Sequence, residues 1–170
     1  NGNSIYIGEL HDELQADVIL SHIFKEHAIE AHTMNPFKLH FLVNNNREWD
    51  LKVNKATIWG LSKETSTKII FNGEEFTAED IGNYHYGVVV ESNIFIPEKL
   101  ALVMAGKKQI KNGTSQEEWQ IYQTLSFAMS SSVGIVYAYS RAMLPPYGDD
   151  PRDQKMINKG FCYYRKYLHQ

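Results

Sequence analysis

The segment from Glu9 to His32 constrains the fold of this chain most, because it carries the clearest helical pattern in the sequence. Apolar side chains recur along it about one helical turn apart, at Leu14, Val18, Ile19, Ile23 and Ile29. This pattern predicts an amphipathic helix of several turns. Such a helix buries its apolar stripe only by packing against other elements, so the rest of the chain must complete a core.

Proline and capping residues mark the starts of further predicted helices. One begins at Pro36, and another begins at Pro97 and stops at Gly113. A terminal helix opens with Asp150 as its N-cap and Pro151 in its first turn. Proline suits the first turn, whose N–H groups have no partner within the helix, and glycine suits the position after the last turn.

A two-residue turn predicts a β-hairpin near residues 68–77. Asn72-Gly73 stands between β-branched and aromatic residues, and this dipeptide favours the positive φ values that a tight hairpin turn needs. Thr77 and Asp80 follow in the spacing of a capping box and favour a helix over 78–91, although the valines at 88–90 keep a strand as the alternative.

Ser115 and Glu118 have the spacing of a second capping box. They predict a helix that runs at least to Met129. The expected fold class is therefore α+β and mainly helical, a single-domain helical bundle with one small hairpin. No repeat or linker divides the sequence, so one domain is expected over residues 1–170.

Composition excludes few classes of function. Apolar residues make up 43% of the 170 residues, enough for a core, and the net charge of −3 gives no broad positive field for nucleic acid. A single cysteine, Cys162, excludes an internal disulfide.

The sequence also gives no sign of a membrane-spanning helix, because no run approaches the ~20 apolar residues that such a helix needs. The abrupt start without methionine predicts a piece of a longer protein.

Three aspartates crowd the start of the terminal helix. Asp149, Asp150 and Asp153 can cap amides and complement the helix dipole, as such residues do in many helices. Asp153 also shares a stripe with apolar residues and should point towards the core edge. The three carboxylates suit a divalent cation, Ca²⁺ or Mg²⁺, or a general acid paired with a base.

A second group of polar residues lies in DIGNYHYG at 80–87. His85 is a candidate general base because the pKa of an unperturbed imidazole lies near neutrality, and Asp80 is positioned in sequence to orient it or to hold a metal. The alternative is that His85 is a structural core residue. The zinc pattern H-E-x-x-H, CxxC, the P-loop and GxSxG are all absent from the sequence.

Four motifs in order resemble the bacterial polymorphic-toxin domain family called toxin 44. They are WDLK at 49–52, NYHYG at 83–87, AGKKQ at 105–109 and GDDPRDQKMINKG at 148–160. The resemblance implies catalytic roles for His85, Asp80, Asp150 and Asp153. It implies supporting roles for Asp50, Lys52, Asn83, Tyr86, Gln109 and Asp149, and the metal, if there is one, would lie at Asp149, Asp150 and Asp153.

The resemblance also implies a biological setting. A toxin of this kind forms the carboxyl-terminal cassette of a secreted protein, is delivered into target bacteria, and is neutralised in the producer by a cognate immunity protein. The main hypothesis is a hydrolase that cleaves peptidoglycan or its lipid-linked precursor by Asp/His chemistry. The alternatives are a ribonuclease using His85 with Lys52 or Lys107, and a binding module without catalysis.

Overall fold

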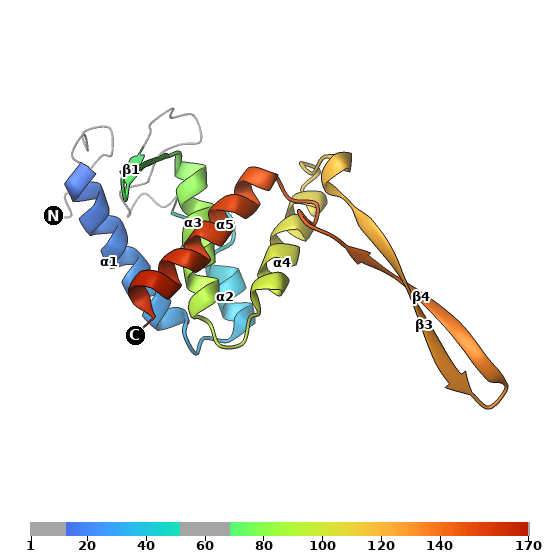
Figure 1. Cartoon of the computed structure of the whole chain (residues 1–170). Coiled ribbons are helices and arrows are strands. Elements are labelled where there is room, and N and C mark those ends of the chain that lie inside the picture. Colours follow the sequence, from blue (N-terminus) through green and yellow to red (C-terminus); the bar gives the residue numbers. More distant parts are fainter. Residues whose placement is uncertain (1–12, 52–68, 170) are drawn as a thin grey trace. The chain divides into compact units, whose positions relative to one another are not determined.

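A computed structural model of the chain describes residues 13–51 and 69–169 (Figure 1). The chain divides into two compact units. The first unit contains the described residues up to Glu98 together with those from Lys155 onward, and the second contains Lys99–Gln154. The class is α+β and mainly helical, as the sequence predicts. Among the described residues, no helix is both long and apolar enough to cross a membrane.

Residues 9–12 of the first predicted helix lie outside the described residues. Its predicted apolar stripe is partly wrong, because Val18 and Ile29 are 63% and 68% exposed and the buried side chains are Leu20, Phe24, Ala28 and Ala31. Helices otherwise form where apolar spacing and capping predict them. They are α1 (Glu13–Ala31), α2 (Pro36–Leu42), α4 (Glu98–Lys111) and α5 (Pro151–Tyr163). The Asn35 side chain accepts a hydrogen bond from the backbone N–H of Phe37 and caps α2, with Pro36 in its first turn. A π-helical turn, η3 (Tyr164–Leu168), continues α5.

The predicted hairpin is also confirmed. Strands β1 (Ile69–Phe71) and β2 (Glu74–Phe76) pair antiparallel, with Ile69 opposite Phe76. Asn72 and Gly73 form the turn with φ values of 50° and 73°. Both values lie in the left-handed region, where asparagine and glycine are the preferred residues.

Residues 78–92 form a helix, which decides between the two structures that the sequence left open. Helix α3 (Ala78–Ser92) begins with a complete capping box. The Thr77 hydroxyl accepts from the Asp80 N–H at 3.1 Å, and the Asp80 carboxylate accepts from the Thr77 N–H at 2.8 Å. The valines at 88–90 are buried in this helix, where core packing outweighs their strand preference.

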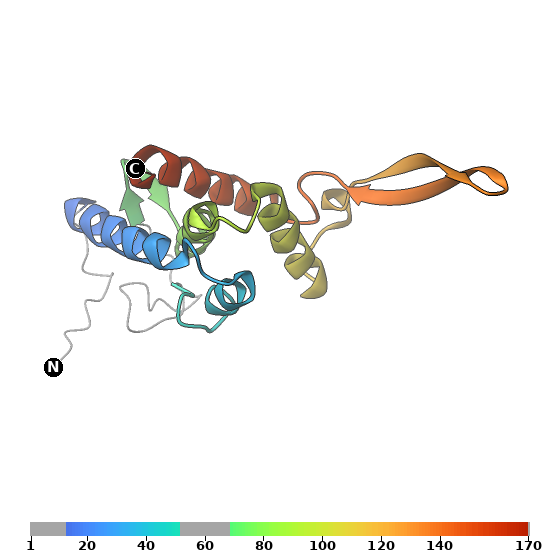
Figure 2. The same cartoon turned by 90° about the horizontal axis from the view of Figure 1, so that it is seen from below.

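The helix predicted from Ser115 to Met129 is wrong. Only a single turn forms there, η2 (Glu117–Trp119), and its N-cap Gln116 makes no side-chain cap hydrogen bond. Strands β3 (Tyr122–Ser131) and β4 (Gly134–Met143) then pair antiparallel over their full length, and Figure 2 shows them as one twisted ribbon. Gly134, with a φ of 118°, permits the tight turn, and the β-branched and aromatic residues of β4 favour strand pairing.

Aromatic side chains dominate the core of the first unit. Phe24 of α1 packs against Phe71 of β1 and Tyr84 of α3, with ring centroids 5.5 and 5.6 Å apart. Tyr163 of α5 joins the same cluster at 5.7 Å from Phe24. Leu20, Ile81 and Val88 fill the space around these rings. Helices α1 and α3 and the β1–β2 hairpin thus share one core.

Helices α3 and α5 approach each other closely at two glycines. A Cβ atom at Gly87 would lie 2.1 Å from the Ile157 carbonyl oxygen, and one at Gly160 would lie 2.1 Å from the Tyr84 carbonyl oxygen. Each gap is too small for a methyl group beside backbone atoms. The glycines that close two of the four sequence motifs are therefore required for helix packing.

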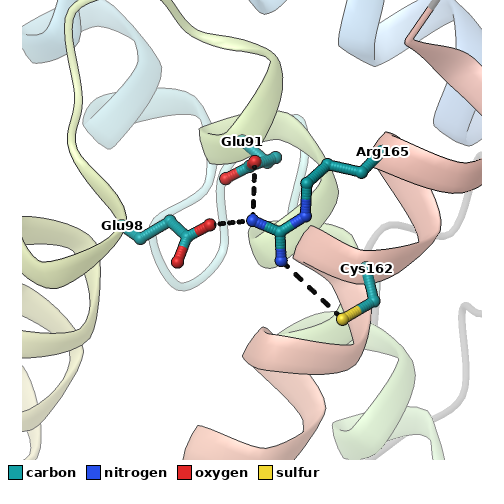
Figure 3. Close-up of polar contacts among 4 residues, drawn as sticks. All are labelled: Glu91, Glu98, Cys162 and Arg165. Atoms are coloured by element: carbon teal, nitrogen blue, oxygen red, sulfur yellow. Dashed lines mark hydrogen bonds and ion pairs between the residues drawn. The ribbon is translucent and has the colours of Figure 1, made fainter.

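A charged group joins the carboxyl end of α3 to the end of α5 on the surface of the first unit (Figure 3). The Arg165 guanidinium contacts Glu91 at 3.2 Å and also contacts Glu98, and its other terminal nitrogen lies 3.8 Å from the Cys162 sulfur. Burial, the largest cause, raises the pKa of the Glu91 carboxyl, while Arg165 lowers it. Because Arg165 and Glu98 are exposed, these pairs contribute little to the free energy of unfolding.

We predict that Gly87→Ala destabilises the protein by about 1–3 kcal/mol, because the added methyl group forces α3 and α5 apart and this outweighs the better helix propensity of alanine. Thermal or urea unfolding measures the change. Gly113→Ala is the control: it has nothing within 4 Å, so only its positive φ is penalised. Equal or greater stability of Gly87→Ala would contradict the close approach.

Candidate functional site

Two histidines from different helices meet in the first unit. His27 of α1 and His85 of α3 lie 2.8 Å apart, measured from His27 Nδ1 to His85 Nε2. The His85 side chain is buried, with 1% of its surface exposed, whereas His27 is half-buried. His27 is therefore the imidazole that a molecule from solvent can reach, and His85 is its buried partner.

Aromatic rings hold both imidazoles in place. The Trp49 indole stacks on His27 with ring centroids 4.2 Å apart and an angle of 6° between the planes. Phe24 stacks on His85 at 5.7 Å and 23°. Trp49 is itself buried, so it serves as a wall of the site. Stacking limits ring rotation and keeps the two nitrogen atoms facing each other.

Both histidines are neutral at neutral pH. Burial lowers the pKa of His27 from 6.5 to about 4, although the charge of Glu26 raises it in part. Burial, and then the neighbouring His27, lower the pKa of His85 well below its ordinary value. The hydrogen bond therefore joins two neutral rings, of which one donates and the other accepts.

This arrangement allows His27 to act as a base or as an acid. If His27 Nδ1–H donates to His85 Nε2, the His27 Nε2 atom carries a lone pair and can accept a proton. If His85 Nε2–H donates instead, His27 Nε2 carries a proton that it can give. A histidine oriented by a second hydrogen-bonding group is the usual arrangement of a general acid–base catalyst.

Two predicted carboxylates of the first unit, those of Asp80 and Asp50, have structural partners. The Asp80 carboxylate is buried and takes part in the capping box, where it also accepts from the Thr77 hydroxyl at 2.9 Å. Asp50, beside Trp49, is buried and accepts from the Asn46 N–H at 2.8 Å. Catalytic or supporting roles for these two carboxylates stay predictions. Lys52 lies outside the described residues.

Asn83 and Tyr86 lie on α3 on either side of His85 and are both half-buried. Among the described residues, the Asn83 amide nitrogen is buried without a hydrogen-bond partner. Residues two apart on a helix point to nearly opposite sides. Asn83 therefore points away from the side of α3 on which His85 meets His27.

In the second unit, the AGKKQ motif at 105–109 contacts the start of the GDDPRDQKMINKG motif. The Asp150 N–H donates to the Gln109 side-chain oxygen at 2.6 Å. A Cβ atom at Gly106 would lie 1.9 Å from the Tyr147 carbonyl oxygen, so α4 contacts this loop directly. The Asp150 carboxylate accepts from the Arg152 N–H at 2.8 Å, which confirms its capping role.

Asp149 is the most perturbed carboxyl of this loop. It is buried and accepts from the Gln154 side-chain amide at 2.7 Å. Burial raises its pKa to about 6, against the lowering effects of that hydrogen bond and of the Asp150 N–H. Asp153 is half-buried in the first turn of α5. The expectation that Asp153 faces His85 stays a prediction.

The predicted divalent cation finds no preformed site in the part of the chain that the structure describes. No three histidine, cysteine, aspartate or glutamate side chains come together there as metal ligands. The carboxylates of Asp149 and Asp150 have the hydrogen-bond partners given above. A Ca²⁺ or Mg²⁺ ion at Asp149, Asp150 and Asp153 stays a prediction, since calcium would need six or more oxygen ligands in total.

His27 is a candidate site residue that the sequence analysis did not select. Leu20, Phe24, Ala28 and Ala31 are buried along α1, and His27 stands between two of them. A histidine adjoining the buried stripe of an amphipathic helix is a detectable signal, but it does not reveal which residue it contacts. That partner lies 58 positions further along the chain.

We predict that lowering the pH will reduce the free energy of unfolding, because His27 binds a proton more weakly in the folded protein than in the unfolded chain. Its pKa is about 4 in the folded protein and 6.5 without burial, so as the pH falls from 6.5 to 4 the unfolded chain binds a proton that the native chain does not. The free energy of unfolding falls over this range, by about 1–2 kcal/mol after allowance for solvent screening of a half-buried ring.

Urea unfolding of the wild type and of His27→Gln at several pH values measures this effect. The comparison is needed because Asp149, with its pKa raised to about 6, has the opposite effect: its proton stabilises the folded state as the pH falls through 6. Asp149 is common to both proteins, so the difference between the two curves reports the histidine pair. Parallel curves between pH 6.5 and 4 would refute the lowered pKa of His27.

Comparison with protein-family models, with curated proteins and with solved structures gives no match to this chain. The resemblance to toxin 44 therefore rests on the four motifs alone.

Proposed function

We propose that this chain is a hydrolase domain of an antibacterial toxin, in which His27 is the general base and His85 is its positioning residue. The observation that carries the proposal is the 2.8 Å contact between a half-buried and a fully buried imidazole. Most buried histidines need only one structural partner. Here the partner is a second histidine that is only half-buried, and a general base needs access to its substrate.

The proposed reaction is the attack of a water molecule on the substrate. His27 Nε2 removes a proton from the water as its oxygen forms the new bond, and His27 Nδ1–H donates to His85 Nε2. The resulting imidazolium lies on the face of Trp49, which attracts a cation. The same proton then passes to the leaving group, and His27 returns to its neutral form.

The substrate in this proposal is peptidoglycan or its lipid-linked precursor. The support is the toxin 44 resemblance, which implies secretion, delivery into rival bacteria and a cognate immunity protein. The net charge of −3 favours a substrate other than a polyanion. Asp149, Asp150 and Asp153 remain candidates for further carboxylate chemistry in this hydrolase.

The contact between the two histidines favours a mechanism with a single general base over one in which a base and an acid act on opposite sides of the substrate. In a metal-independent ribonuclease, one group removes a proton on one side of the phosphate and another gives a proton on the other side. Two imidazoles hydrogen-bonded to each other cannot stand on both sides of a phosphate. For this reason the ribonuclease is the weaker alternative, although folding does bring a second histidine, 58 positions away in sequence, next to His85.

We predict that His27→Ala abolishes toxicity in a bacterial growth assay, with survival rising by about 100-fold or more, since general acid–base catalysis contributes 10²–10⁴ to a rate. His85→Ala should also reduce toxicity, because His27 loses its orienting partner. His85→Gln should restore part of it, since its amide oxygen can accept from His27 Nδ1.

His40→Ala is the matched control, because His40 is an exposed histidine on α2. Circular dichroism checks that each variant is folded. Full toxicity of folded His27→Ala and His85→Ala would eliminate the catalytic pair and leave a binding module. A loss with His40→Ala as great as with His27→Ala would also contradict the assignment.

We predict that the location of the toxin inside the cell distinguishes the substrates. Expression with an export signal should kill bacteria, and expression without one should leave growth nearly unchanged, because the cell wall lies outside the inner membrane. Colony counts after induction measure the difference. Equal killing from the cytoplasm, with degraded cellular RNA, would support the ribonuclease instead.

A further inference from the structure

The ribbon of β3 and β4 exposes an apolar face. Residues paired directly across two antiparallel strands have side chains on the same side of the sheet, so Phe127 shares a face with Ala138, and Met129 with Val136. Phe127, Met129 and Val136 are 49%, 59% and 48% exposed. With the half-buried Leu125 and Ala138, these side chains form what we call the apolar face.

The opposite side of the ribbon has a different chemistry. It carries Thr124, Ser126, Ser130, Tyr137 and Tyr139, and we call it the hydroxyl face. Ile135 lies on this side too, but most of its neighbours can hydrogen-bond to water. Arg141, the only charged residue between Tyr122 and Met143, also lies on this side, with its guanidinium 4.4 Å from the Tyr122 ring. Ala128 and Met143 lie on this side as well, and Ile135, Tyr137 and Tyr139 are 69%, 63% and 72% exposed. The hydroxyl face differs from the apolar face in that most of its exposed side chains carry a group that can hydrogen-bond to water.

The ribbon also lacks the usual protection of exposed strands. Within the part of the chain that the structure describes, each of its strands pairs with only the other, so both edges present backbone groups without a strand partner. Natural proteins protect such edges with lysine, proline or inward-pointing charge, and none of these occurs between Tyr122 and Met143. An isolated two-stranded hairpin is marginally stable in water at best. Both features indicate that another protein chain covers this ribbon.

The shape of the apolar face matches a second copy of itself. In its β3 row the large residues Leu125 and Phe127 lie opposite the small residues Ser140 and Ala138 of the β4 row, and Met129 lies opposite Val136. A two-fold axis parallel to the strands would place the β3 row of each copy over the β4 row of the other. Large side chains would then fit over small ones twice, as a self-complementary interface requires.

We propose that two copies of this chain associate through the apolar faces of their β3–β4 ribbons, with Phe127 of each copy packed over Ala138 of the other. No charge on either face opposes the contact. The exposed parts of the large side chains in two copies amount to on the order of 600–800 Å², which is the range of weak interfaces. The dimer is therefore concentration-dependent.

The surface is independent of the histidine pair, so its test is independent of catalysis. Sedimentation velocity of the purified 170-residue chain from about 5 to 500 µM should show a monomer–dimer equilibrium, as weak interfaces do. His27→Ala should dimerise as the wild type does. A monomer at every concentration would overturn the proposal, and a monomer that co-sediments with phosphatidylcholine–phosphatidylglycerol vesicles would replace the second copy with a lipid surface.

Matched variants test the geometry. Phe127→Lys should weaken association by at least about tenfold, because it buries a charge over the partner's small row. Tyr139→Lys on the hydroxyl face is the control and should leave association unchanged. Equal weakening by both variants would overturn the assignment of the interface. Circular dichroism checks folding, and Val136→Lys replaces Phe127→Lys if that variant fails to fold.

A mixing experiment tests the pairing of the two rows. Ala138→Glu should also be monomeric by itself, because its carboxylate would lie against Phe127 of the partner. A mixture of Phe127→Lys and Ala138→Glu should recover dimers, since the introduced lysine of one copy faces the introduced glutamate of the other. Absence of a mixed dimer would contradict the two-fold axis along the strands.

Discussion

The burial of α3 on nearly all sides is the constraint on which the first unit depends. Polar side chains that such a helix carries into the core need hydrogen-bond partners, and among the described residues the Asn83 amide nitrogen is the exception. Asp80 has such partners in the capping box, and Ser92 donates to the Val89 carbonyl oxygen at 2.8 Å. His85 reaches across to His27 of α1. The contact between the two histidines is thus a consequence of how the core is built.

Glycines set the depth at which α3 lies. Gly87 and Gly160 let the backbones of α3 and α5 touch, and this removes the space that side chains would otherwise need between them. Phe24 and Trp49 then confine the two imidazoles by stacking on their faces. Packing of this kind fixes the orientation of a catalytic group before any substrate arrives, which limits the reorganisation that catalysis requires.

The first residues of the aspartate-rich motif make structural contacts in the second unit. Asp150 caps α5 and binds Gln109, and Asp149 is buried beside Gln154. Capping was the simpler reading of these residues from the sequence, and the hydrogen bonds of Asp150 confirm it. Gly106 and Gln109 of the AGKKQ motif both contact the loop that leads into α5, so these two motif residues have a structural explanation.

The sequence by itself determined most of the local structure. Capping residues, proline positions and the Asn72-Gly73 turn act within a few residues, so they identified four helices and the first hairpin. The same reasoning failed at β3. Ser115 and Glu118 resemble a helix start, whereas strand pairing with β4 is a contact between residues up to 21 positions apart, as in Tyr122 opposite Met143.

The sequence also identified His85 as a candidate residue, because it lies in the N-x-H-Y-G motif. Only the tertiary structure decided that His27 is its partner, because the neighbours of a buried polar group are set by which helices pack together. It also decided which side of the β3–β4 ribbon is apolar, because strand register assigns each side chain to a face.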